Sequence, residues 1–460
     1  MILSEARTVP FWTDRPGRPG PHPALTGDTQ ADLLIVGGGY TGLWAAIIAK
    51  EENPRADVLL VEAEHIGFGG SGRNGGFVSD SLTHGLSHGA SRWPGELETL
   101  VRLGRENLAD LADTLERHGI DADLRLNGKT TVAVAPHHVA ELRALEKLHR
   151  EQGDDVTWLD AEEMRSDVAS PTYLGGLRVR NTGGVVDPGK LVFGLAEIAA
   201  RLGVRLAEDT PVTGLTRTGS GVAARTPFGT IQAGQVLLGT NAYPAPLRRL
   251  RPFILPVWDY ALVTEPLSAE RLASLGWAER QGITDAGNQF HYYRLTCDDR
   301  ILWGGYDAIY HFGGRVDEAL SRRDSSHRLL ARHFFETFPQ LEGVGFTHRW
   351  GGAIDSTSRF TATFGTAMGG RIGYAIGYTG LGVAASRFGA RVALDLLARR
   401  DTPATRLSMV RRPPIPFPPE PLRWPVVELT RRALIDADER EGRRGPWLRL
   451  LDRFGVGFDS

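Results

Sequence analysis

The apolar pattern near the start of the chain predicts a strand, a helix and a second strand in close succession. Residues 31–36 read Ala-Asp-Leu-Leu-Ile-Val, a short run typical of a buried strand, and Leu43–Lys50 are predicted to form a helix. Residues 57–62 read Asp-Val-Leu-Leu-Val-Glu and predict the next strand.

Farther along, helical periodicity alternates with strand patterns. Helices are expected over 96–119, 139–152, 191–202 and 381–399, and shorter strands over 130–134, 204–207, 211–215, 221–226, 229–233 and 236–242. Long strands rich in aromatic residues are expected over 252–267 and 289–307, where they would form a large antiparallel sheet. A proline-rich strap follows Asp401, and a helical tail follows the strap.

Three glycines separate the first predicted strand from its helix. Gly37, Gly39 and Gly42 have the G-x-G-x-x-G spacing, in which the glycines allow a tight turn, close approach of a pyrophosphate and close helix packing. Glu62 follows Gly42 by twenty residues, where a ribose-binding carboxylate is expected. Together these residues favour a dinucleotide site at a helix N-terminus over a simple glycine-rich turn.

A second glycine-rich stretch, residues 67–76, contains six glycines in ten residues. Glycine has no side chain to bury and loses the most entropy when it is fixed, so this stretch is not ordinary core. It is either a flexible loop or a place where backbone approaches a flat ligand closely. Its position directly after the dinucleotide unit favours the ligand.

Composition and charge argue against several other classes of protein. A chain of 460 residues exceeds what one core usually holds, so two intertwined domains are expected. The net charge of -2 gives no electrostatic case for binding nucleic acid or a membrane surface, and no apolar run is long enough for a transmembrane helix. The single cysteine, Cys297, excludes an internal disulfide and a cysteine-rich zinc site, and it agrees with a cytoplasmic location. No metal site is expected.

In this order, the segments resemble the D-amino acid oxidase-like flavoprotein family, which contains glycine oxidase, monomeric sarcosine oxidase and γ-glutamylputrescine oxidase. The resemblance covers roughly residues 30–405. It is carried mainly by 37–62, by the loop 71–76 and by 377–382, and the loop's Arg-Asn-Gly-Gly sequence is most similar to the γ-glutamylputrescine oxidase branch.

The resemblance implies a fold of the α/β (α+β) class, with a Rossmann-like FAD-binding domain and a discontinuous substrate domain built on an antiparallel sheet. The expected division is an N-terminal arm at 1–28, an FAD-binding domain at 29–90, 185–250 and 365–405, a substrate domain at 91–184 and 251–364, and a C-terminal strap and helical tail at 406–460.

The resemblance also implies an extended FAD along the first domain. A helix N-terminus near 377–381 would face the pyrimidine end of the flavin, where its dipole stabilises the negative charge of the reduced ring. The implied cofactor residues are Gly37, Gly39, Tyr40, Thr41, Gly42, Glu62, Ser71, Arg73, Asn74, Gly75, Gly76, Val212, Thr240, Asn241, Ala242, Gly377, Tyr378, Thr379, Gly380 and Leu381. Relatives of the sarcosine oxidase kind tether FAD through a C-terminal cysteine, whereas 355–358 here read Asp-Ser-Thr-Ser, so non-covalent FAD is expected.

The catalytic candidates are cations and tyrosines. A cation in the glycine loop could orient substrate or bind phosphate and backbone, and arginines on strands could clamp a carboxylate or form structural ion pairs. Three tyrosines lie on strands expected above the flavin, where an aromatic residue is either core or ligand: Tyr260, Tyr292 and Tyr293. The chosen candidates are Arg73, Tyr260, Tyr293, Arg294 and Arg359.

The implied reaction is oxidation of a C–N bond in an amine or amino acid by hydride transfer to flavin N5, which gives an imine that hydrolyses. Oxygen would then reoxidise the flavin and yield hydrogen peroxide. Related oxidases use a lysine near N5 for this step, but no lysine follows Lys190, so a dehydrogenase with another electron acceptor is an alternative. A flavin-binding subunit of a larger complex is a second alternative, suggested by the tail. Substrate identity and oligomeric state are not predicted.

Overall fold

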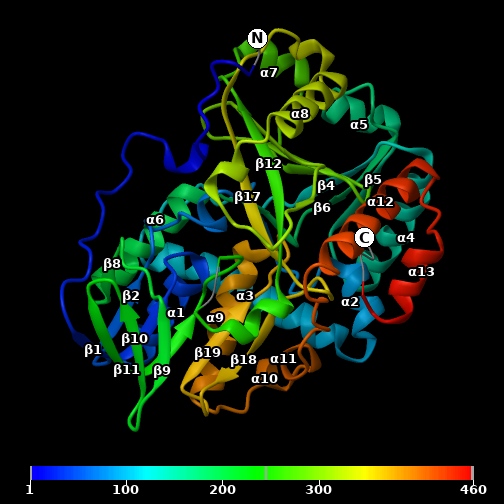
Figure 1. Cartoon of the computed structure of the whole chain (residues 1–460). Helices are drawn as coiled ribbons and strands as arrows, with labels where there is room; N and C mark the ends of the chain where they lie inside the picture. The colour runs from blue at the N-terminus through cyan, green and yellow to red at the C-terminus, as the bar shows by residue number, and fades with distance from the viewer. Residues whose placement is uncertain (1–2, 244–245, 457–460) are drawn as a thin grey trace.

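The computed structural model describes residues 3–243 and 246–456, which fold around two large β-sheets (Figure 1). Residues 1–2 of the expected arm, 244–245 of the expected FAD-binding domain and 457–460 of the expected tail lie outside the described residues.

The first sheet is mainly parallel and has the strand order β18-β19-β11-β1-β2-β8, with β10 paired to β11 and β9 paired to β10. Its strands are β1 (Thr29–Val36), β2 (Val58–Val61), β8 (Arg205–Ala207), β9 (Gly214–Arg217), β10 (Val222–Thr226), β11 (Gly229–Leu238), β18 (Thr363–Ala367) and β19 (Ile372–Ile376). Val36 pairs with Leu238 on one side and with Val61 on the other, so β1, β11 and β2 end at the same sheet edge. Ligands of open α/β sheets bind at such an edge.

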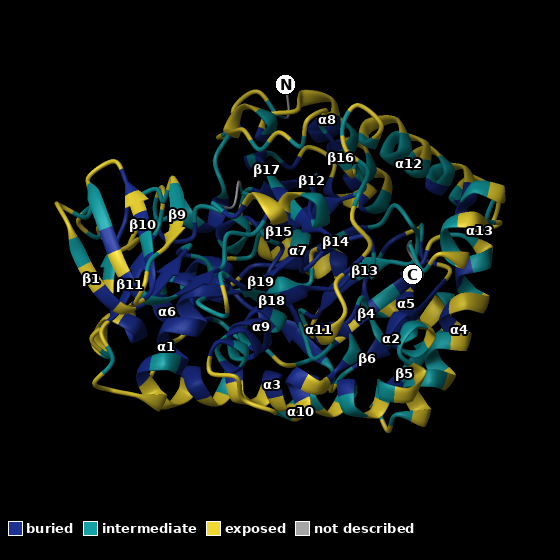
Figure 2. Ribbon diagram, turned by 60° about the horizontal axis from the view of Figure 1, so that its bottom comes forward, coloured by how far each residue is buried: buried dark blue, intermediate teal, exposed yellow. Residues whose placement is uncertain are grey.

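Helices cover one face of this sheet. They are α1 (Tyr40–Glu52), α3 (Leu97–Arg117), α6 (Pro188–Arg201) and α9 (Gly382–Leu397). Helix α1 contacts both α6 and α9, and its Leu43 and Trp44 are fully buried. Because α1 is enclosed by the sheet and two helices, it is apolar on nearly all sides, which explains why its sequence lacks a polar stripe. Figure 2 shows much of α1, α6 and α9 in the dark blue of buried residues.

The second sheet has nine strands in the order β16-β12-β15-β14-β13-β4-β6-β5, with β17 paired to β12. Its strands are β4 (Lys129–Ala133), β5 (Val156–Leu159), β6 (Gly175–Val179), β12 (Leu255–Thr264), β13 (Gly282–Asp285), β14 (His291–Leu295), β15 (Ile301–Gly305), β16 (Ile309–Tyr310) and β17 (Phe346–Ser356). Helices α4 (Pro136–Glu151), α5 (Ala161–Asp167), α7 (Ala269–Leu275) and α8 (Asp324–Thr337) pack around it. A separate two-stranded ladder joins β3 (Phe77–Ser79) to β7 (Gly183–Val185), and α2 (Leu86–Arg92) follows β3.

The expected α/β (α+β) class is confirmed, and two of the expected long strands are corrected in detail. The strand expected from residue 252 begins at Leu255, because Arg248–Phe253 form a 3-10 helix. The stretch 289–307 is a hairpin of β14 and β15 that turns at 296–300 and holds Cys297, as its turn-forming sequence indicates. Strands of the first sheet alternate along the chain with those of the second, and we keep the expected domain division as a proposal.

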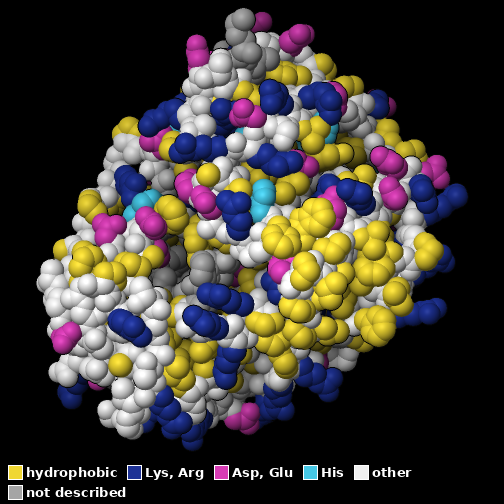
Figure 3. Space-filling view, in the orientation of Figure 1, with side chains coloured by type: hydrophobic (Ala, Val, Ile, Leu, Met, Phe, Trp, Pro, Cys, Tyr) yellow, Lys and Arg dark blue, Asp and Glu magenta, His cyan; other side chains and the backbone are white. Residues whose placement is uncertain are grey.

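The C-terminal segment packs against the second sheet. It contains α10 (Pro403–Arg406), α11 (Ser408–Arg411), the strap 412–422, α12 (Arg423–Glu439) and α13 (Pro446–Arg453). Asp438 on α12 accepts hydrogen bonds from the backbone N–H groups of Asn288 and Gln289. Figure 3 shows hydrophobic side chains gathered over the region where α12 lies in Figure 1. The exposed large apolar residues of this segment include Ile415, Leu422, Trp424 and Leu429. Among the described helices, none is both long and apolar enough to cross a membrane.

Candidate active site

The glycine turn lies at the carboxyl edge of the first sheet, as its spacing predicts. Gly37 has a φ of +114°, and a Cβ there would lie 2.6 Å from Gly239 O, so only glycine fits. A Cβ on Gly42 would lie 2.0 Å from Gly37 O, which explains the third glycine as a helix-to-turn contact. Helix α1 begins directly after Gly39 without a side-chain cap of its own. Apart from the Tyr40 N–H, which donates to Ser71 Oγ, its first N–H groups have no side-chain cap and lie at the sheet edge.

Glu62 closes the same turn from β2. Its Oε2 accepts the Gly38 N–H at 2.6 Å, and its Oε1 accepts the Glu64 N–H at 3.1 Å. Burial raises the pKa of this carboxyl, and the backbone donors oppose that rise. The carboxylate is thus held in a fixed position beside the first turn of α1.

The second glycine-rich stretch forms a tight loop between the two sheets. Ser71 Oγ accepts the Tyr40 N–H at 2.9 Å, which ties the loop to the start of α1. Trp12 from the N-terminal arm donates to Asn74 O at 2.8 Å, and Trp350 from β17 donates to Arg73 O at 2.9 Å. The loop is therefore fixed from both sides and is not a flexible connection.

Arg73 ties this loop to the second sheet. Its guanidinium donates to Phe68 O at 2.8 Å and to Gly351 O at 3.0 Å, and it forms an ion pair with Glu318 at 2.8 Å. The side chain is buried, whereas Glu318 is partly exposed. The structure thus gives Arg73 backbone and carboxylate partners. Of the two roles expected from the sequence, binding of backbone agrees with these contacts.

The second predicted helix N-terminus belongs to α9. Gly377 has a φ of +84°, and its N–H donates to Asp355 Oδ2 at 2.5 Å, while the Tyr378 N–H donates to Oδ1 at 3.2 Å. Burial raises the pKa of Asp355 to about 7. Helix α9 then begins at Gly382 without a side-chain cap, so its N-terminal N–H groups are free to face a ligand.

These segments enclose one cavity of about 1210 Å³. It extends along the carboxyl edge of the first sheet and continues between the second sheet and helices α3, α4 and α12. The expected cofactor residues that line it are Gly37, Gly39, Tyr40, Thr41, Glu62, Ser71, Arg73, Asn74, Gly75, Val212, Thr240, Asn241, Tyr378, Thr379, Gly380 and Leu381. Gly42, Gly76, Ala242 and Gly377 are not among its lining residues, although each is adjacent in sequence to one that is.

The second sheet presents a carboxylate and a tyrosine to the cavity. Tyr292 Oη donates to Asp259 Oδ2 at 2.5 Å, and both residues line the cavity. Burial raises the pKa of Asp259 to about 6, against the effect of the Tyr292 hydrogen bond. A Cβ on Gly75 would lie 2.5 Å from the Tyr292 ring, so this pair lies directly above the glycine loop.

Register explains why Asp259 faces the loop. Asp259 is paired with Gly352 on β17, and directly paired residues share one face of a sheet. A Cβ on Gly352 would lie 3.3 Å from Arg73 Cβ, so this face looks onto the glycine loop. The neighbouring Tyr260 takes the other face, where its ring packs against His327 and its hydroxyl donates to Leu320 O at 3.1 Å. Tyr260 is nevertheless also among the residues that line the cavity.

Three other catalytic candidates are not among the residues that line the cavity. Tyr293 is fully buried, and its hydroxyl lies 2.8 Å from that of Tyr173. The Arg294 guanidinium donates to the backbone carbonyls of Val186 and Gly76, and that of Arg359 donates to Ala362, Met409 and Arg412 carbonyls. Both arginines use their donors to hold backbone, so the geometry gives them no direct contact with a substrate.

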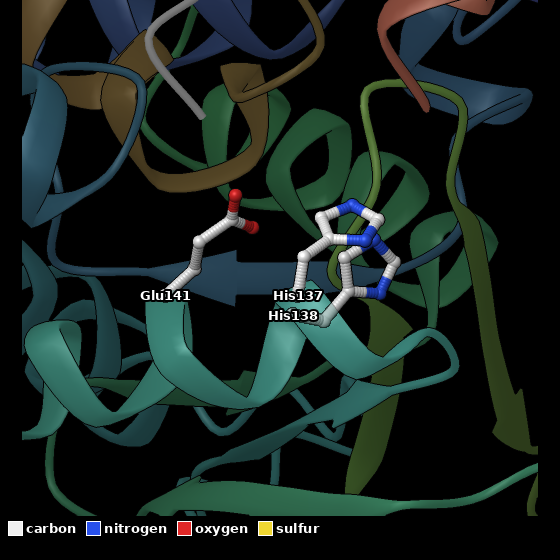
Figure 4. Close-up of side chains that lie close together, drawn as sticks. All are labelled: His137, His138 and Glu141. Atoms are coloured by element: carbon white, nitrogen blue, oxygen red, sulfur yellow. The ribbon is translucent and has the colours of Figure 1, made fainter. Parts of the chain in front are cut away.

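A small histidine cluster lies at the start of α4 (Figure 4). The possible ligand atoms of His137, His138 and Glu141 lie within 4.8 Å of one another, and His138 Nδ1 accepts the Val134 N–H at 3.4 Å. A tetrahedral zinc ion would need these atoms about 3.3 Å apart. The absence of a metal site therefore stays a prediction.

The architecture and the cavity are typical of a dinucleotide-dependent oxidoreductase, with a glycine turn at the edge of one sheet and a second sheet lining the rest of the cavity. The FAD dependent oxidoreductase (DAO) family model matches residues 32–396, and the chain belongs to this family. The expected family and the expected FAD cofactor are thereby confirmed, and the chain is a flavoprotein enzyme.

Individual relatives agree with this assignment. Gamma-glutamylputrescine oxidoreductase of Escherichia coli (strain K12) is 31% identical over 398 residues, covering 85% of this chain and 89% of the relative. Probable oxidoreductase OrdL of Haemophilus influenzae is 28% identical over 387 residues, covering 82% of this chain and 85% of the relative. The crystal structure of glycine oxidase from Geobacillus kaustophilus superposes with a TM-score of 0.67 at 23% identity, covering 81% of this chain and 96% of that chain. At this identity, the likeness to glycine oxidase shows the fold alone.

The residues present fit FAD. The glycine turn at Gly37 and Gly39 leaves room for a pyrophosphate where a Cβ would clash, and two uncapped helix N-termini face the cavity. Thr240 Oγ1 at the end of β11 is buried and has no hydrogen-bond partner within 3–243 and 246–456. A cofactor phosphate or hydroxyl would supply the missing partner.

Two residues that line the cavity, Asp259 and Lys129, were not predicted as site residues from the sequence. Asp259 gives no local signal, since a single acid in an apolar strand reads as a turn or an edge position. Lys129 lines the cavity, but it was not selected because the sequence interpretation looked for a lysine only after Lys190, where none occurs.

Proposed function

We propose that this enzyme oxidises the C–N bond of an amine or amino acid by hydride transfer to FAD. The observation that carries the proposal is the half-buried Asp259–Tyr292 pair, which lies above the glycine loop and faces the cavity. The names of the relatives support the same class, because they include γ-glutamylputrescine oxidoreductase, sarcosine oxidase subunit beta and glycine oxidase.

An amine reaches the cavity mainly as an ammonium, which cannot release a hydride from its α-carbon. The Asp259 carboxylate attracts this cation, and its pKa of about 6 suits a group that accepts a proton at neutral pH. Tyr292 orients the carboxylate through its 2.5 Å hydrogen bond. The neutral amine then lies with its lone pair available to the reacting carbon.

FAD supplies the hydride acceptor when it is bound. The protein's part is to place the substrate and to stabilise charge. The N-terminus of α9 stabilises negative charge at the end of the cavity formed by 379–382, and Asp355 holds the turn that precedes it. The imine product leaves the chamber or is hydrolysed by water.

We further propose that FAD is held without a covalent bond and is reoxidised by oxygen to give hydrogen peroxide. The only cysteine, Cys297, is exposed in the β14–β15 turn and is not among the residues that line the cavity. A cytoplasmic location remains a prediction from the same cysteine count.

The test begins with the colour of the purified protein, which should be yellow and should release intact FAD on acid precipitation. Anaerobic addition of amines and of both enantiomers of amino acids should then bleach the oxidised flavin, and γ-glutamylputrescine belongs in the first screen because of the Escherichia coli relative. Peroxide formed in air supports the oxidase. Bleaching without peroxide supports the dehydrogenase alternative.

A second candidate role is a flavin-binding subunit of a larger complex. It is favoured by the exposed apolar residues of the strap and α12 and by the likeness to sarcosine oxidase subunit beta of Rhodobacter capsulatus, at 23% identity over 71% of this chain. Amine-dependent bleaching by the isolated monomer would exclude this role.

A further inference from the structure

The cavity continues from the glycine loop into a second compartment, which is enclosed by helices. Residues 77–87 lead from the glycine loop through β3 to α2, and they line the cavity without a break. The apolar residues that enclose the compartment beyond them come from α2, α3, α4, α12 and α13 and include Leu86, Leu97, Val101, Leu145, Val427 and Leu451. We call this part of the cavity the helical compartment. None of its apolar residues belongs to the set expected to hold FAD, so it is open to another ligand.

The C-terminal segment closes the helical compartment. The turn between α12 and α13 reaches α4, because a Cβ on Gly442 would lie 3.0 Å from Glu141 Oε1. The end of α13 reaches α2 in the same way, since a Cβ on Gly455 would lie 2.8 Å from Arg92 Nη1. Figure 1 shows α12 and α13 on the side of the molecule where α4 lies. The two tail helices therefore form a wall of the cavity.

Each tail helix turns one stripe of side chains toward the cavity. The stripe on α12 consists of Val426, Val427, Thr430, Arg431 and Leu434. These positions repeat at intervals of three and four residues, so they share one face of the helix. On α13, Leu448 and Leu451 line the cavity and are likewise three residues apart. Leu429 on α12 and Leu450 on α13 are exposed and are not among the lining residues, so they mark the outer faces of the two helices.

Charged side chains also border the helical compartment, but they interact with one another. Arg105 Nη2 donates to Asp154 at 2.6 Å, and His149 Nδ1 lies 2.6 Å from the same carboxylate. Burial raises the pKa of Asp80 to about 7 and lowers the pKa of Lys129, and each of these two charges opposes the shift of the other. A charged ligand group would lose its water here without gaining a free partner, which is costly.

The arginines that the tail contributes are paired in the same way. Arg431 forms an ion pair with Glu428 at 2.8 Å, and Arg444 forms one with Asp452 at 2.6 Å. The apolar side chains are thus what remains for a ligand to cover. Apolar surface that faces water inside a cavity gains free energy when another apolar group displaces the water.

We propose that the helical compartment holds an apolar group at the end of the substrate remote from the reacting amine, and that α12 and α13 set the specificity for it. The assignment rests on the proposed function, since it places the reacting C–N bond beside Asp259 at the other end of the cavity. The occupant is part of the substrate because the compartment is continuous with the glycine loop along residues 77–87. The substrate is therefore an amine with an extended apolar group, and not a compact, wholly polar amino acid.

Straight-chain primary amines from butylamine to octylamine test the apolar group on the wild-type holoenzyme. KM should fall by about 4-fold for each added methylene until the chain fills the compartment, since burial of one methylene contributes a factor of this size, and kcat should stay nearly constant. 1,8-Diaminooctane has the same carbon chain as octylamine but ends in an ammonium, so its KM should be higher by at least about 10-fold. A KM that does not fall with chain length, or a diamine that matches octylamine, would overturn the proposal.

Leu451→Asn places an amide of similar size on the inner face of α13, so it should raise KM for octylamine by about 10-fold and leave KM for butylamine nearly unchanged. Leu450→Asn makes the same change at the next residue, on the outer face, and is the matched control that should alter neither value. Val427→Thr keeps the shape of its side chain on α12 and should act in the same direction, which decides the matter if Leu451→Asn does not fold. Equal effects of these inner-face variants on both amines, or no effect on either, would refute a role of the tail in specificity.

Binding of alcohols, which lack the reacting amine, separates this proposal from the proposed reaction. Calorimetry on the holoenzyme should show that 1-octanol binds more tightly than 1-butanol, by about 4-fold for each additional methylene. Leu451→Asn should reduce this preference by about 10-fold, and Leu450→Asn should leave it unchanged. If no amine bleaches the flavin, the proposed reaction fails while this comparison still decides what the compartment binds. Equal affinity for the two alcohols would overturn the assignment of the compartment.

Discussion

Asp259→Asn tests whether this half-buried carboxylate accepts the substrate's proton. The substitution keeps the shape of the side chain and its two hydrogen bonds, because the Asn oxygen can accept the Tyr260 N–H and its amide can donate to Tyr292 Oη. The substitution removes the negatively charged, ionised form of the side chain.

The raised pKa of Asp259 gives the direction and approximate size of the effect on stability. The pKa of Asp259 is raised from 3.8 to about 6, so the folded protein holds this proton more tightly than the unfolded chain does. The cost of ionising it in the fold is fully present above pH 6 and disappears as the pH falls below 3.8. At 1.36 kcal/mol per pKa unit the cost is about 3 kcal/mol at pH 8 and about 1.6 kcal/mol at pH 5. Asp259→Asn should therefore stabilise the fold, and more so at pH 8 than at pH 5.

The effect on activity has the opposite sign. Loss of a general base typically costs 10²–10⁴ in rate, so flavin reduction by a saturating amine should slow by at least about 100-fold. The pH dependence of the wild-type rate near pH 6 should disappear in the variant.

Two measurements on the same preparations decide this prediction. Anaerobic stopped-flow records the loss of oxidised-flavin absorbance across the pH range, and guanidinium unfolding of the holoenzyme at pH 8 and pH 5 records the stability. Asp436→Asn, an exposed carboxylate on α12, is the control and should change neither quantity. A variant that reduces flavin within threefold of the wild-type rate, with the same pH profile, would refute the reasoning.

Three further predictions concern the cofactor site and the strap. Gly42→Ala forces a Cβ to within 2.0 Å of Gly37 O, so the purified variant should contain little FAD by its flavin-to-protein absorbance ratio; normal flavin content would contradict the turn geometry. Asp355→Asn leaves one of the two N–H groups before α9 without an acceptor, at a cost of about 1–3 kcal/mol, so FAD should dissociate roughly 10-fold more readily in a flavin-release titration, and an unchanged affinity would count against this role. Arg359→Ala removes the donor to three backbone carbonyls, so limited proteolysis should cut the strap 412–422 faster while the flavin spectrum stays normal; protection equal to wild type would disprove the anchor.

The glycine turn at the sheet edge was predictable because its determinants are local. Gly37, Gly39 and Gly42 fix a turn whose strand and helix are adjacent in sequence, and Glu62 follows at a distance set by one helix and one strand. The same holds for the loop ending at Gly76, where only close backbone approach explains so many glycines.

The chamber was harder to predict, because residues on strands buried on both sides give no sign of the face they occupy. Tyr260 and Tyr293 were chosen; Tyr260 lines the cavity together with its neighbour Asp259, whereas Tyr293 does not and its neighbour Tyr292 does. Because side chains alternate along a strand, a shift of one position reverses the face. No local pattern distinguishes the two choices when both faces are covered. The arginine predictions met a similar difficulty, since a guanidinium that binds a carboxylate and one that binds backbone carbonyls look alike in a sequence.

The cofactor site has a consequence for the order in which the protein is made. Its walls come from the turn at Gly37, the loop at Ser71, Thr240 at the end of β11 and the start of α9 at Gly382. On the ribosome, the glycine turn is complete long before the start of α9 has been synthesised. If FAD lies along this cavity as proposed, its binding site is complete only after more than four-fifths of the chain has been translated.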